Sequence, residues 1–409
     1  MTVSGSAARP RLIRALNEQL MLDHIRATGS LSRADLSRIS GLAKNTVSLA
    51  LGNLERAGLV RPAGVRTGVP GPAAVLYEVN PEAGFVLGLD VGGQYLRGAI
   101  ADSAGVVRAR ATLRARARTG PGRVAALAKL GAELRAEAGF GPGALGQTVL
   151  GSPGIYDPAH ETLTLAAGLP GWGEPTVLRD LRRAFGTELV LENDIDAAAL
   201  AEQAHGHGRD VTSFAFVSVG TGIGMGLVID GKLHRGAHGA AGEIGFLPMD
   251  DDQTDPADVR RLGGLETVAS AGGIVRAARR AGMHGPLSAR TVFEAASRGD
   301  ARAHGVVEAE ATLIARAVCA VIAVADPHLI VLGGGVGQAA AFLDRVAGRV
   351  RELAPVVPPM RVSALGDDAV VDGCLAAGAT RLWERLTAGL APPPPNGSEI
   401  RRSGDTPVR

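Results

Sequence analysis

Two adjacent polar residues, Asn193 and Asp194, follow the apolar run that begins at Leu189. Side chains of these types at a strand end can bind two neighbouring hydroxyl groups of a ligand, and Asp194 can accept a proton from one of them. A base of this kind serves phosphoryl transfer to an alcohol. On local sequence alone the alternative is an Asx turn, in which Asn193 caps an alanine-rich helix over residues 195–203.

Three further apolar segments, residues 85–90, 214–219 and 327–332, each end in glycines. Such turns let backbone N–H groups approach a phosphate closely, and a carboxylate beside one can hold Mg²⁺ or a water. The candidate nucleotide- or phosphate-binding residues are Asp90, Gly92, Gly93, Gly220, Thr221, Gly222 and Gly334. Gly334 belongs to the third turn, whose glycines would let an adenine and ribose lie against the backbone. A single glycine turn is more often an ordinary tight turn. The ordered set predicts two lobes that present phosphate loops across a cleft.

The first 80 residues have the pattern of a winged helix-turn-helix. Apolar residues three or four apart predict a first helix over residues 11–25, with Leu12, Ile13, Leu16, Leu20, Met21 and Ile25 on its inner face. Ser32 and Asp35 can form a capping box for a second helix over residues 33–39. Gly41 permits a turn into a third helix over residues 44–57, and two short strands then form a wing.

The start of the third helix is the part of this motif that enters the major groove of DNA. Its polar residues are the candidates for base and phosphate contact, namely Lys44, Asn45, Thr46 and Ser48. Arg33 at the start of the second helix and Arg66 in the wing are expected nearer the DNA backbone. The alternative is a small helical bundle that docks on the rest of the chain or on a partner protein.

Charge is distributed unevenly along the 409 residues. The whole chain carries a formal net charge of +2, but residues 1–80 hold ten Lys and Arg against five Asp and Glu. A basic head before a slightly acidic remainder fits a protein of which only the head contacts a phosphate backbone. Cys319 and Cys374 are the two cysteines, too few for a disulfide framework or a cysteine metal site. With no apolar run of eighteen residues and no secretory signal, we expect a cytoplasmic protein without a membrane partner.

Ordered motifs between residues 84 and 388 resemble the ROK family of repressors and sugar kinases. They are DxGG, PGxxD, LPGW, ENDxxAxAxxE, GTGIGxG, GKLxRGAHGxAGEIG, GGLExxAS and DPxxIVLGGG. The resemblance implies an α/β fold, actin-like or hexokinase-like, with two lobes and a sugar in the cleft between them. The expected domains are the winged helix-turn-helix (1–80), a small lobe (84–195 plus 370–388), a large lobe (196–369) and a disordered tail (389–409).

The same resemblance assigns roles to individual residues. Sugar binding is implied for Asn193, Asp194, Glu243 and Glu266. In a kinase of this family Asp194 would be the catalytic base, and the glycine turns with Asp90 would surround the phosphates of ATP.

Departures from the family pattern argue against catalysis. Phe246 stands where the kinase form has a histidine that serves sugar and zinc, and the segment from Asp251 lacks the expected cysteines, so no zinc or other metal site is predicted. Gly168 replaces an asparagine before Leu-Pro-Gly-Trp, and Gln94 replaces a threonine. Losing a partner to a buried hydroxyl costs about 1–3 kcal/mol, which changes which sugar is preferred. No cofactor is expected to be required, although vestigial ATP and Mg²⁺ binding stays open.

Together these features predict a sugar-responsive transcriptional regulator, a repressor of carbohydrate uptake or metabolism genes. Its expected partners are operator DNA, a small carbohydrate effector and further copies of itself in a homodimer or homotetramer. The alternative is an ATP-dependent ROK sugar kinase, with or without DNA binding as a second function. A third hypothesis is a DNA-binding protein without a ligand, whose second part serves only oligomerisation.

Overall fold

The computed structural model describes residues 8–67, 73–141, 144–157, 160–164, 168–186, 188–249, 255–388 and 390. Contacts group the chain into two units. Unit 1 comprises residues 1–84, 102–106 and 381–409, and unit 2 comprises residues 85–101 and 107–380. Within the described part, no helix is long and apolar enough to cross a membrane. The predicted tail 389–409 lies outside the described residues, except for Leu390.

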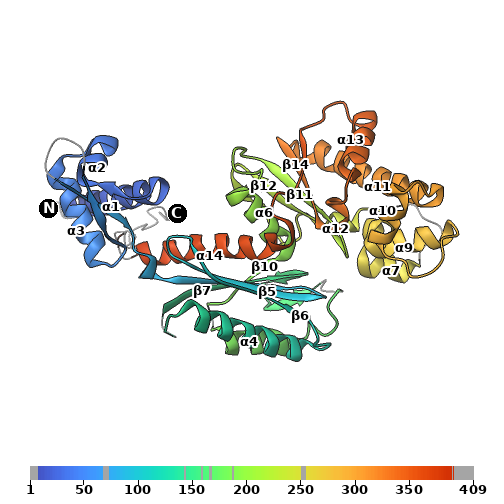
Figure 1. The fold of residues 1–409 in the computed structure, drawn as a ribbon, viewed down its shortest axis with the longest axis horizontal. Helices are drawn as coiled ribbons and strands as arrows, with labels where there is room; N and C mark the ends of the chain where they lie inside the picture. The colour runs from blue at the N-terminus through green and yellow to red at the C-terminus, as the bar shows by residue number, and fades with distance from the viewer. Residues whose placement is uncertain are drawn as a thin grey trace, which may run out of the picture. The chain divides into compact units, whose positions relative to one another are not determined.

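Unit 1 contains the predicted helix-turn-helix and wing (Figure 1). Its elements are α1 (Ala8–Thr28), β1 (Leu31–Ser32), α2 (Arg33–Ser40), α3 (Lys44–Arg56), β2 (Val60–Arg66), β3 (Ala74–Val79) and the 3-10 turn η1 (Pro81–Ala83). The strands form a sheet of order β1-β3-β2, in which β2 and β3 are antiparallel. Ser32 and Asp35 make the predicted capping box, and Gly41 has the left-handed φ of 72° that its turn requires. The tip of the wing, residues 68–72, lies outside the described residues.

The inner face of α1 differs from the predicted one. Met21 and Ile25 are buried as expected, whereas Leu12, Ile13, Leu16 and Leu20 are exposed. The buried stripe runs through Ala15, Glu18, Met21, Leu22 and Ile25 instead. Asn53 of α3 donates a hydrogen bond to Glu18, so a polar pair occupies a stripe that apolar spacing could not reveal.

The core of unit 1 also includes the end of the last helix, α14 (Ala369–Ala388). Trp383 is buried there, its ring lies 4.7 Å from the Arg26 guanidinium, and its indole N–H donates to the Ser103 carbonyl over 3.1 Å. This packing explains why unit 1 includes residues 102–106 and 381–388. The domain boundaries expected from the sequence differ, because they end the DNA-binding domain at residue 80 and assign residues 370–388 to the small lobe.

Unit 2 is built on two five-stranded sheets. The first has the order β10-β7-β4-β5-β6, and in it β4, β7 and β10 run parallel. Its strands are β4 (Phe85–Val91), β5 (Tyr95–Asp102), β6 (Val107–Arg114), β7 (Leu145–Ser152) and β10 (Val190–Asn193). Helices α4 (Gly120–Ala138) and α5 (Pro175–Phe185) pack on one face, and a short hairpin joins β8 (Ile155–Asp157) to β9 (Thr162–Thr164).

The second sheet has the order β13-β12-β11-β14-β15. Its strands are β11 (Phe214–Val219), β12 (Ile223–Ile229), β13 (Lys232–Leu233), β14 (Leu329–Gly333) and β15 (Met360–Val362). The remaining elements are α6 (Asp194–His205), η3 (Ile244–Phe246), α7 (Pro256–Leu262), α8 (Gly264–Ala269), α9 (Ala271–Arg280), α10 (Ala289–Ser297), α11 (Ala301–Ala325), α12 (Gly334–Gly337), α13 (Phe342–Leu353) and η4 (Gly366–Asp368). Residues of α8, α9, α10, α11 and α13 complete a large apolar core against this sheet.

Helices α6 and α14 meet in direct backbone contact within unit 2. A Cβ atom at Gly373 of α14 would lie 1.7 Å from the carbonyl oxygen of Ala197 in α6, so only glycine permits this approach. On its other sides α14 packs against the first sheet, where a Cβ at Gly151 would meet Val370. Helix α14, which packs on the first sheet, and strand β12 together fix the position of α6, whose first residue is Asp194.

Candidate functional site

Parallel pairing places the predicted site residues at one edge of the first sheet. In the register of β4 and β7 Asp90 is opposite Gly151, and in that of β10 and β7 Asn193 is opposite Ser152. The carboxyl ends of these strands therefore coincide, which is where ligands bind in open α/β sheets. Asp194, the next residue, begins α6 at the same edge.

The side chain of Asn193 serves as a helix cap. Its Oδ1 accepts hydrogen bonds from the backbone N–H groups of Ile195 (2.9 Å) and Asp196 (3.1 Å), and its Nδ2 donates to the Gly154 carbonyl over 3.2 Å. Both lone pairs of Oδ1 are then used, and one N–H of the amide remains for a ligand. The Asx cap suggested by local sequence is thus present, and it holds the amide in a fixed position beside Asp194.

Asp90 is a buried carboxylate that Arg97 already engages. Arg97 Nη1 donates to Asp90 Oδ2 over 3.3 Å, and its Nη2 lies 3.4 Å from Asp367. Burial, and then the charge of Asp194, raise the pKa of Asp90 to about 7, while Arg97 opposes the shift. A carboxylate that already accepts a hydrogen bond from a guanidinium has fewer lone pairs left for Mg²⁺, which prefers charged oxygen donors.

Asp194, Glu243 and Glu266 form an acidic cluster. Burial raises the pKa of Asp194 to about 6, although the Ile195 N–H that donates to it over 2.9 Å lowers it. Burial, followed by the charge of Asp194, also raises the pKa of Glu243. Glu266 Oε2 accepts the Ile223 N–H over 2.8 Å, and burial raises its pKa too. The charge of Asp194 thus contributes to the raised pKa of both glutamates, and the fourth predicted sugar residue, Asn193, directly precedes Asp194 in the sequence.

Two neighbouring features escaped the sequence prediction. Arg235 makes a bidentate ion pair with buried Glu192, in which Nε lies 3.1 Å from Oε1 and Nη2 lies 2.5 Å from Oε2. Asp196 is 5% exposed, and its Oδ1 has no hydrogen-bond partner among the residues that the structure describes. Burial, then the charge of Glu192, raises the pKa of Asp196 to about 7. Each residue stands inside a quoted motif, but sequence spacing does not show which charges are buried.

The predicted phosphate loops of the second sheet lie side by side. Register pairs Ser218 of β11 with Gly333 of β14, and a Cβ at Gly220 would lie 3.6 Å from the Gly335 N–H nitrogen. Gly334 has φ of 77°, and a Cβ there would lie 2.4 Å from the Val219 carbonyl oxygen. A Cβ at Gly222 would meet Glu266 Oε2 at 2.9 Å. These close approaches require glycine at Gly334 and Gly222, and nucleotide binding at the two turns stays a prediction.

The positions that depart from the family pattern are accessible. Phe246 ends η3 with 39% of its surface exposed, and a Cβ at Gly168 would have no neighbour within 4 Å. Part of the segment in which zinc ligands were sought, residues 250–254, lies outside the described residues. Among the residues that the structure describes, no three His, Cys, Asp or Glu side chains are arranged to hold a metal ion.

In unit 1 the predicted DNA-contacting residues divide into two groups. Lys44, Asn45 and Ser48 are exposed, and helical geometry puts them within one 100° sector of α3. Thr46 is partly buried and lies at a small hollow between α1 and α3, with Ile13 and Leu49 among its lining residues. The exposed face at the start of α3 is therefore formed by three of the four predicted residues, while Thr46 faces α1.

Both predicted backbone-contacting arginines have partners in unit 1. The Arg33 guanidinium lies 4.7 Å from the centre of the Tyr77 ring. Arg66 Nη1 lies 2.9 Å from Asp35 Oδ2, and Arg38 also contacts Asp35. Hydrogen bonds from Ser32 are the main reason that the pKa of Asp35 falls to about 2, so this carboxylate stays charged. Asp35 thus ties the wing to the capping box of α2.

Comparison with known proteins accounts for both units. Residues 86–385 match the model of the ROK family, which is about three quarters of the chain. The chain belongs to the ROK family. Residues 16–61 match a winged helix-turn-helix DNA-binding model, so the ROK domain follows a DNA-binding module.

Individual relatives of this ROK protein include regulators and kinases. A xylose repressor of Caldicellulosiruptor bescii is 26% identical over 386 residues, covering 89% of this chain and 96% of the relative. An N-acetylmannosamine kinase of Yersinia pseudotuberculosis is 33% identical over 298 residues, covering 72% and 98%. The chain spans only 37% of the length of the bifunctional NanE/NanK enzymes of Brucella that it also matches.

Among solved structures, a ROK family transcriptional regulator, a homologue of Escherichia coli Mlc, is similar to the whole fold. The TM-score is 0.73 at 24% identity, over 92% of this chain and 98% of the other. This likeness confirms the predicted fold class, a winged helix-turn-helix followed by the ROK fold.

Proposed function

We propose that this ROK protein is a sugar-responsive transcriptional regulator that represses genes of carbohydrate uptake or metabolism. The observation that carries the proposal is that one chain combines a winged helix-turn-helix with a cluster of the acidic residues Asp194, Glu243 and Glu266, while Arg97 engages Asp90, the carboxylate that a kinase would use beside the phosphates.

The acidic cluster suits a polyhydroxylated ligand. Carboxylates accept hydrogen bonds only, and sugar hydroxyls are donors that need no counter-charge. Burial raises the pKa values of Asp194, Glu243 and Glu266, and the charge of Asp194 adds to the shifts of the two glutamates. Hydroxyl donors delivered to these oxygens stabilise the charged forms, and the remaining Asn193 N–H can donate to a ligand oxygen. A small neutral carbohydrate is the ligand class that this arrangement favours.

The DNA-binding part of the proposed function depends on the exposed face of α3. Lys44 supplies charge for a phosphate, and Asn45 supplies the amide geometry that reads adenine in the major groove. Ser48 lies one turn further along the same sector. Arg33 and Arg66 are held by Tyr77 and Asp35, so their role is to fix α2 and the wing, with their remaining donors available to the DNA backbone.

Regulation follows from linkage between the two ligands. A sugar lowers DNA affinity if it binds more tightly to the conformation that DNA disfavours, with a coupling typically of about 1–3 kcal/mol. Release of operator DNA by the sugar would make the protein a repressor of sugar-inducible genes. Because helix-turn-helix proteins read paired half-sites, we propose a homodimer, or a dimer of dimers, as the DNA-bound form.

A gel-shift titration on DNA from upstream of the protein's own gene tests this function. We expect Lys44→Ala to weaken DNA binding, and one or more simple sugars to release the wild-type protein. Asp194→Asn should bind DNA normally but lose the response to sugar. If no mono- or oligosaccharide changes DNA affinity while DNA binding itself is specific, the sugar-responsive part is wrong and a ligand-independent DNA-binding protein is favoured.

A second candidate function is an ATP-dependent sugar kinase. It is favoured by Asp194, whose pKa of about 6 suits a general base, and by the adjacent turns at Gly220 and Gly334. The Arg97 contact with Asp90 counts against it. A coupled assay with ATP, Mg²⁺ and a panel of hexoses decides, since turnover that Asp194→Asn abolishes would establish the kinase. Arg97→Ala would then raise the rate by releasing Asp90.

A further inference from the structure

The segment that leads from β6 into α4 starts at the edge of the first sheet where the candidate site residues lie. Arg114, the last residue of β6, is opposite Tyr95, the first residue of β5. The next residue, Ala115, donates its N–H to the Gln94 carbonyl over 2.8 Å, in the turn that also contains Gly93. This segment therefore begins beside the turn that follows Asp90.

The first residue of α4 is held at the same edge. A Cβ at Gly120 would lie 2.4 Å from the carbonyl oxygen of Gly171, so only glycine permits this approach. Trp172, the next residue of that loop, donates from its indole N–H to the Ser152 hydroxyl over 2.8 Å. Ser152 is in turn opposite Asn193 in the sheet register. The start of α4 thus lies where helices that follow strand ends bind anions in α/β folds.

Arg123, the fourth residue of α4, is a buried cation without a partner. It is 4% exposed, and its Nε and Nη1 are enclosed and accept no hydrogen-bond partner among the residues that the structure describes. Burial, and then the charge of Arg118, lower the pKa of Arg123. Donors left unmet in a protein interior are costly. The described chain therefore leaves both the charge and the donors of Arg123 unsatisfied.

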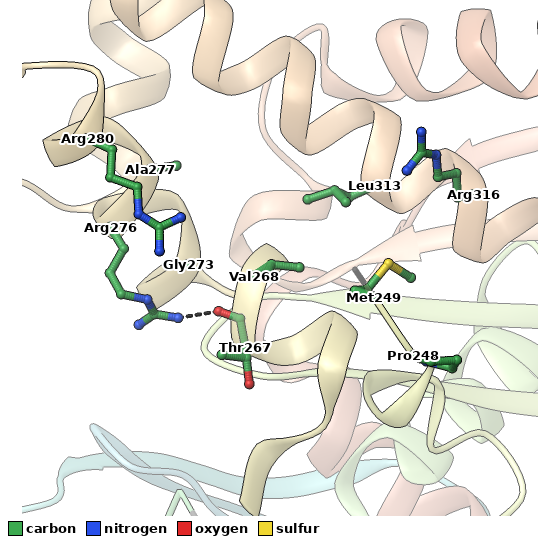
Figure 2. Close-up of a pocket in the computed structure, with 10 residues that line it drawn as sticks. All are labelled: Pro248, Met249, Thr267, Val268, Gly273, Arg276, Ala277, Arg280, Leu313 and Arg316. Carbon is green, nitrogen blue, oxygen red and sulfur yellow. Dashed lines mark hydrogen bonds between the residues drawn. The ribbon is translucent and has the colours of Figure 1, made fainter. Parts of the chain in front are cut away.

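Two other arginines of unit 2 show how this fold otherwise engages a guanidinium. Arg97 donates to the Asp90 carboxylate over 3.3 Å. Arg276, beside the hollow drawn in Figure 2, donates to the backbone carbonyl of Thr267, as the dashed line marks. Both side chains are less deeply buried than that of Arg123, so the deeper guanidinium is the one without an acceptor.

The Arg123 side chain leans toward the start of its helix. Side chains of an α-helix tilt toward its N-terminus, and the effect of Arg118 on the pKa of Arg123 agrees with this direction. Arg118 is exposed and directly precedes the N-cap Thr119, whose hydroxyl accepts the Gly122 N–H over 3.3 Å. A helix N-terminus itself carries about half a positive charge. Two guanidinium groups and a helix N-terminus thus bring positive charge to one place.

Glu174 is a carboxylate near this helix start. A Cβ at Gly171 would lie 3.2 Å from Glu174 Oε1 and 3.4 Å from the Gly120 nitrogen. Glu174 is exposed, and its side chain makes no capping hydrogen bond to α5. It is not among the charges that shift the pKa of Arg123. The single charge of Glu174 does not balance two arginines and a helix N-terminus, so the place stays positive.

We propose that the start of α4 is a ligand site of its own, at which Arg118 and Arg123 bind a phosphate group. Guanidinium forks pair with phosphate oxygens through two parallel hydrogen bonds, and a helix N-terminus adds favourable charge. A carboxylate brings one negative charge, whereas a phosphate group brings close to two, which suits the positive charge gathered here better. The exposed Arg118 meets the incoming anion, and Arg123 supplies the donors behind it. The site goes beyond the proposed sugar response and uses none of its residues.

Calorimetric titration of the full chain tests this site, with inorganic phosphate and glucose 6-phosphate as probes and glucose as the uncharged comparison. Arg123→Met should weaken binding of both phosphates at least tenfold, and Arg118→Met should weaken it less because Arg118 is exposed. Glu174→Gln should tighten binding by removing a competing charge. Equal wild-type affinities for the two probes would identify free phosphate as sufficient, and a tighter ester would show that the sugar part contributes. Lys129→Met is the matched control, because Lys129 is exposed further along α4 and pairs with Glu133.

Thermal unfolding separates a ligand site from a purely structural role. Without phosphate, Arg123→Met should melt at a higher temperature than the wild-type protein, because an apolar side chain replaces an unpaired buried charge. Phosphate should raise the melting temperature of the wild-type protein and not that of the variant. A variant that melts lower than wild type and still binds phosphate normally would overturn the proposal. So would equal phosphate affinities in Arg123→Met and Lys129→Met, or no phosphate binding by the wild-type protein.

Discussion

Asp196 offers a quantitative test of how the site is arranged. It is buried in the first turn of α6, and one of its carboxylate oxygens has no hydrogen-bond partner in the described part of the chain. Glu192, Glu243 and Asp194 add negative charge around it, and Arg235 opposes them. Replacing Asp196 with asparagine removes one buried charge while keeping the shape of the side chain.

The expected magnitude follows from the pKa. Folding raises the pKa of Asp196 from its ordinary value of 3.8 to about 7, mainly through burial. Each pKa unit is worth about 1.4 kcal/mol, so the charged carboxylate costs up to about 4 kcal/mol of folding free energy above pH 7. Because the folded-state pKa is the higher one, this cost is absent below pH 4 and grows as the pH rises to about 7. Asp196→Asn should therefore stabilise the protein at pH 8 and have little effect at pH 4.

Thermal unfolding measured at several pH values between 4 and 8 checks this expectation. At about 2–4 °C per kcal/mol, the variant should melt several degrees above the wild-type protein at pH 8. The difference should shrink steadily as the pH is lowered. Asp210→Asn, at an exposed position after α6, is the matched control and should show no such dependence. A variant that is less stable than wild type at pH 8, or equally shifted at all pH values, would refute the reasoning.

Three further predictions concern the glycine turn at Gly334, the proposed sugar site and the DNA-binding face of α3. Gly334→Ala should destabilise the protein by about 1–3 kcal/mol in denaturant titrations because of its positive φ and close carbonyl contact, whereas Gly335→Ala, with open space around it, should not. Gly168→Asn should fold normally and raise sugar affinity about tenfold in calorimetry, with Gly168→Ala unchanged, if the lost amide is what weakened the site. Lys44→Ala should weaken DNA binding and reduce the salt slope by about one, while Lys129→Ala should leave both unaltered.

Most of unit 1 was predictable because its signals are local. The capping box of Ser32 and Asp35, the turn at Gly41 and the wing strands each depend on a few neighbouring residues. The face of α1 was not, because its burial is decided by α3, and Glu18 lies in the buried stripe through its contact with Asn53. Trp383 joins the same core from about 300 positions further along the chain than Val79, so no local pattern could reveal it.

In the candidate site of unit 2, too, the local features were predictable and the long-range contacts were not. The sequence singled out Asp90, Asn193 and Asp194 by their places after apolar strands, and the parallel register of β4, β7 and β10 brings these strand ends to one edge of the sheet. The charge environment could not be predicted, since it depends on long side chains from other parts of the chain. Arg97 reaches Asp90 from the neighbouring strand, and Arg235 reaches Glu192 over 43 residues of sequence. These two contacts decide which carboxylates are left for a ligand.

The central claim is that one ligand controls the binding of the other, and sugar affinity in the presence and absence of operator DNA tests it most directly. Calorimetry with the effector sugar should give an affinity about 5- to 150-fold lower for the DNA-bound protein than for the free protein, and sugar should weaken DNA binding by the same factor. Asp194→Asn should remove sugar binding in both states. Equal sugar affinities with and without DNA would contradict the account.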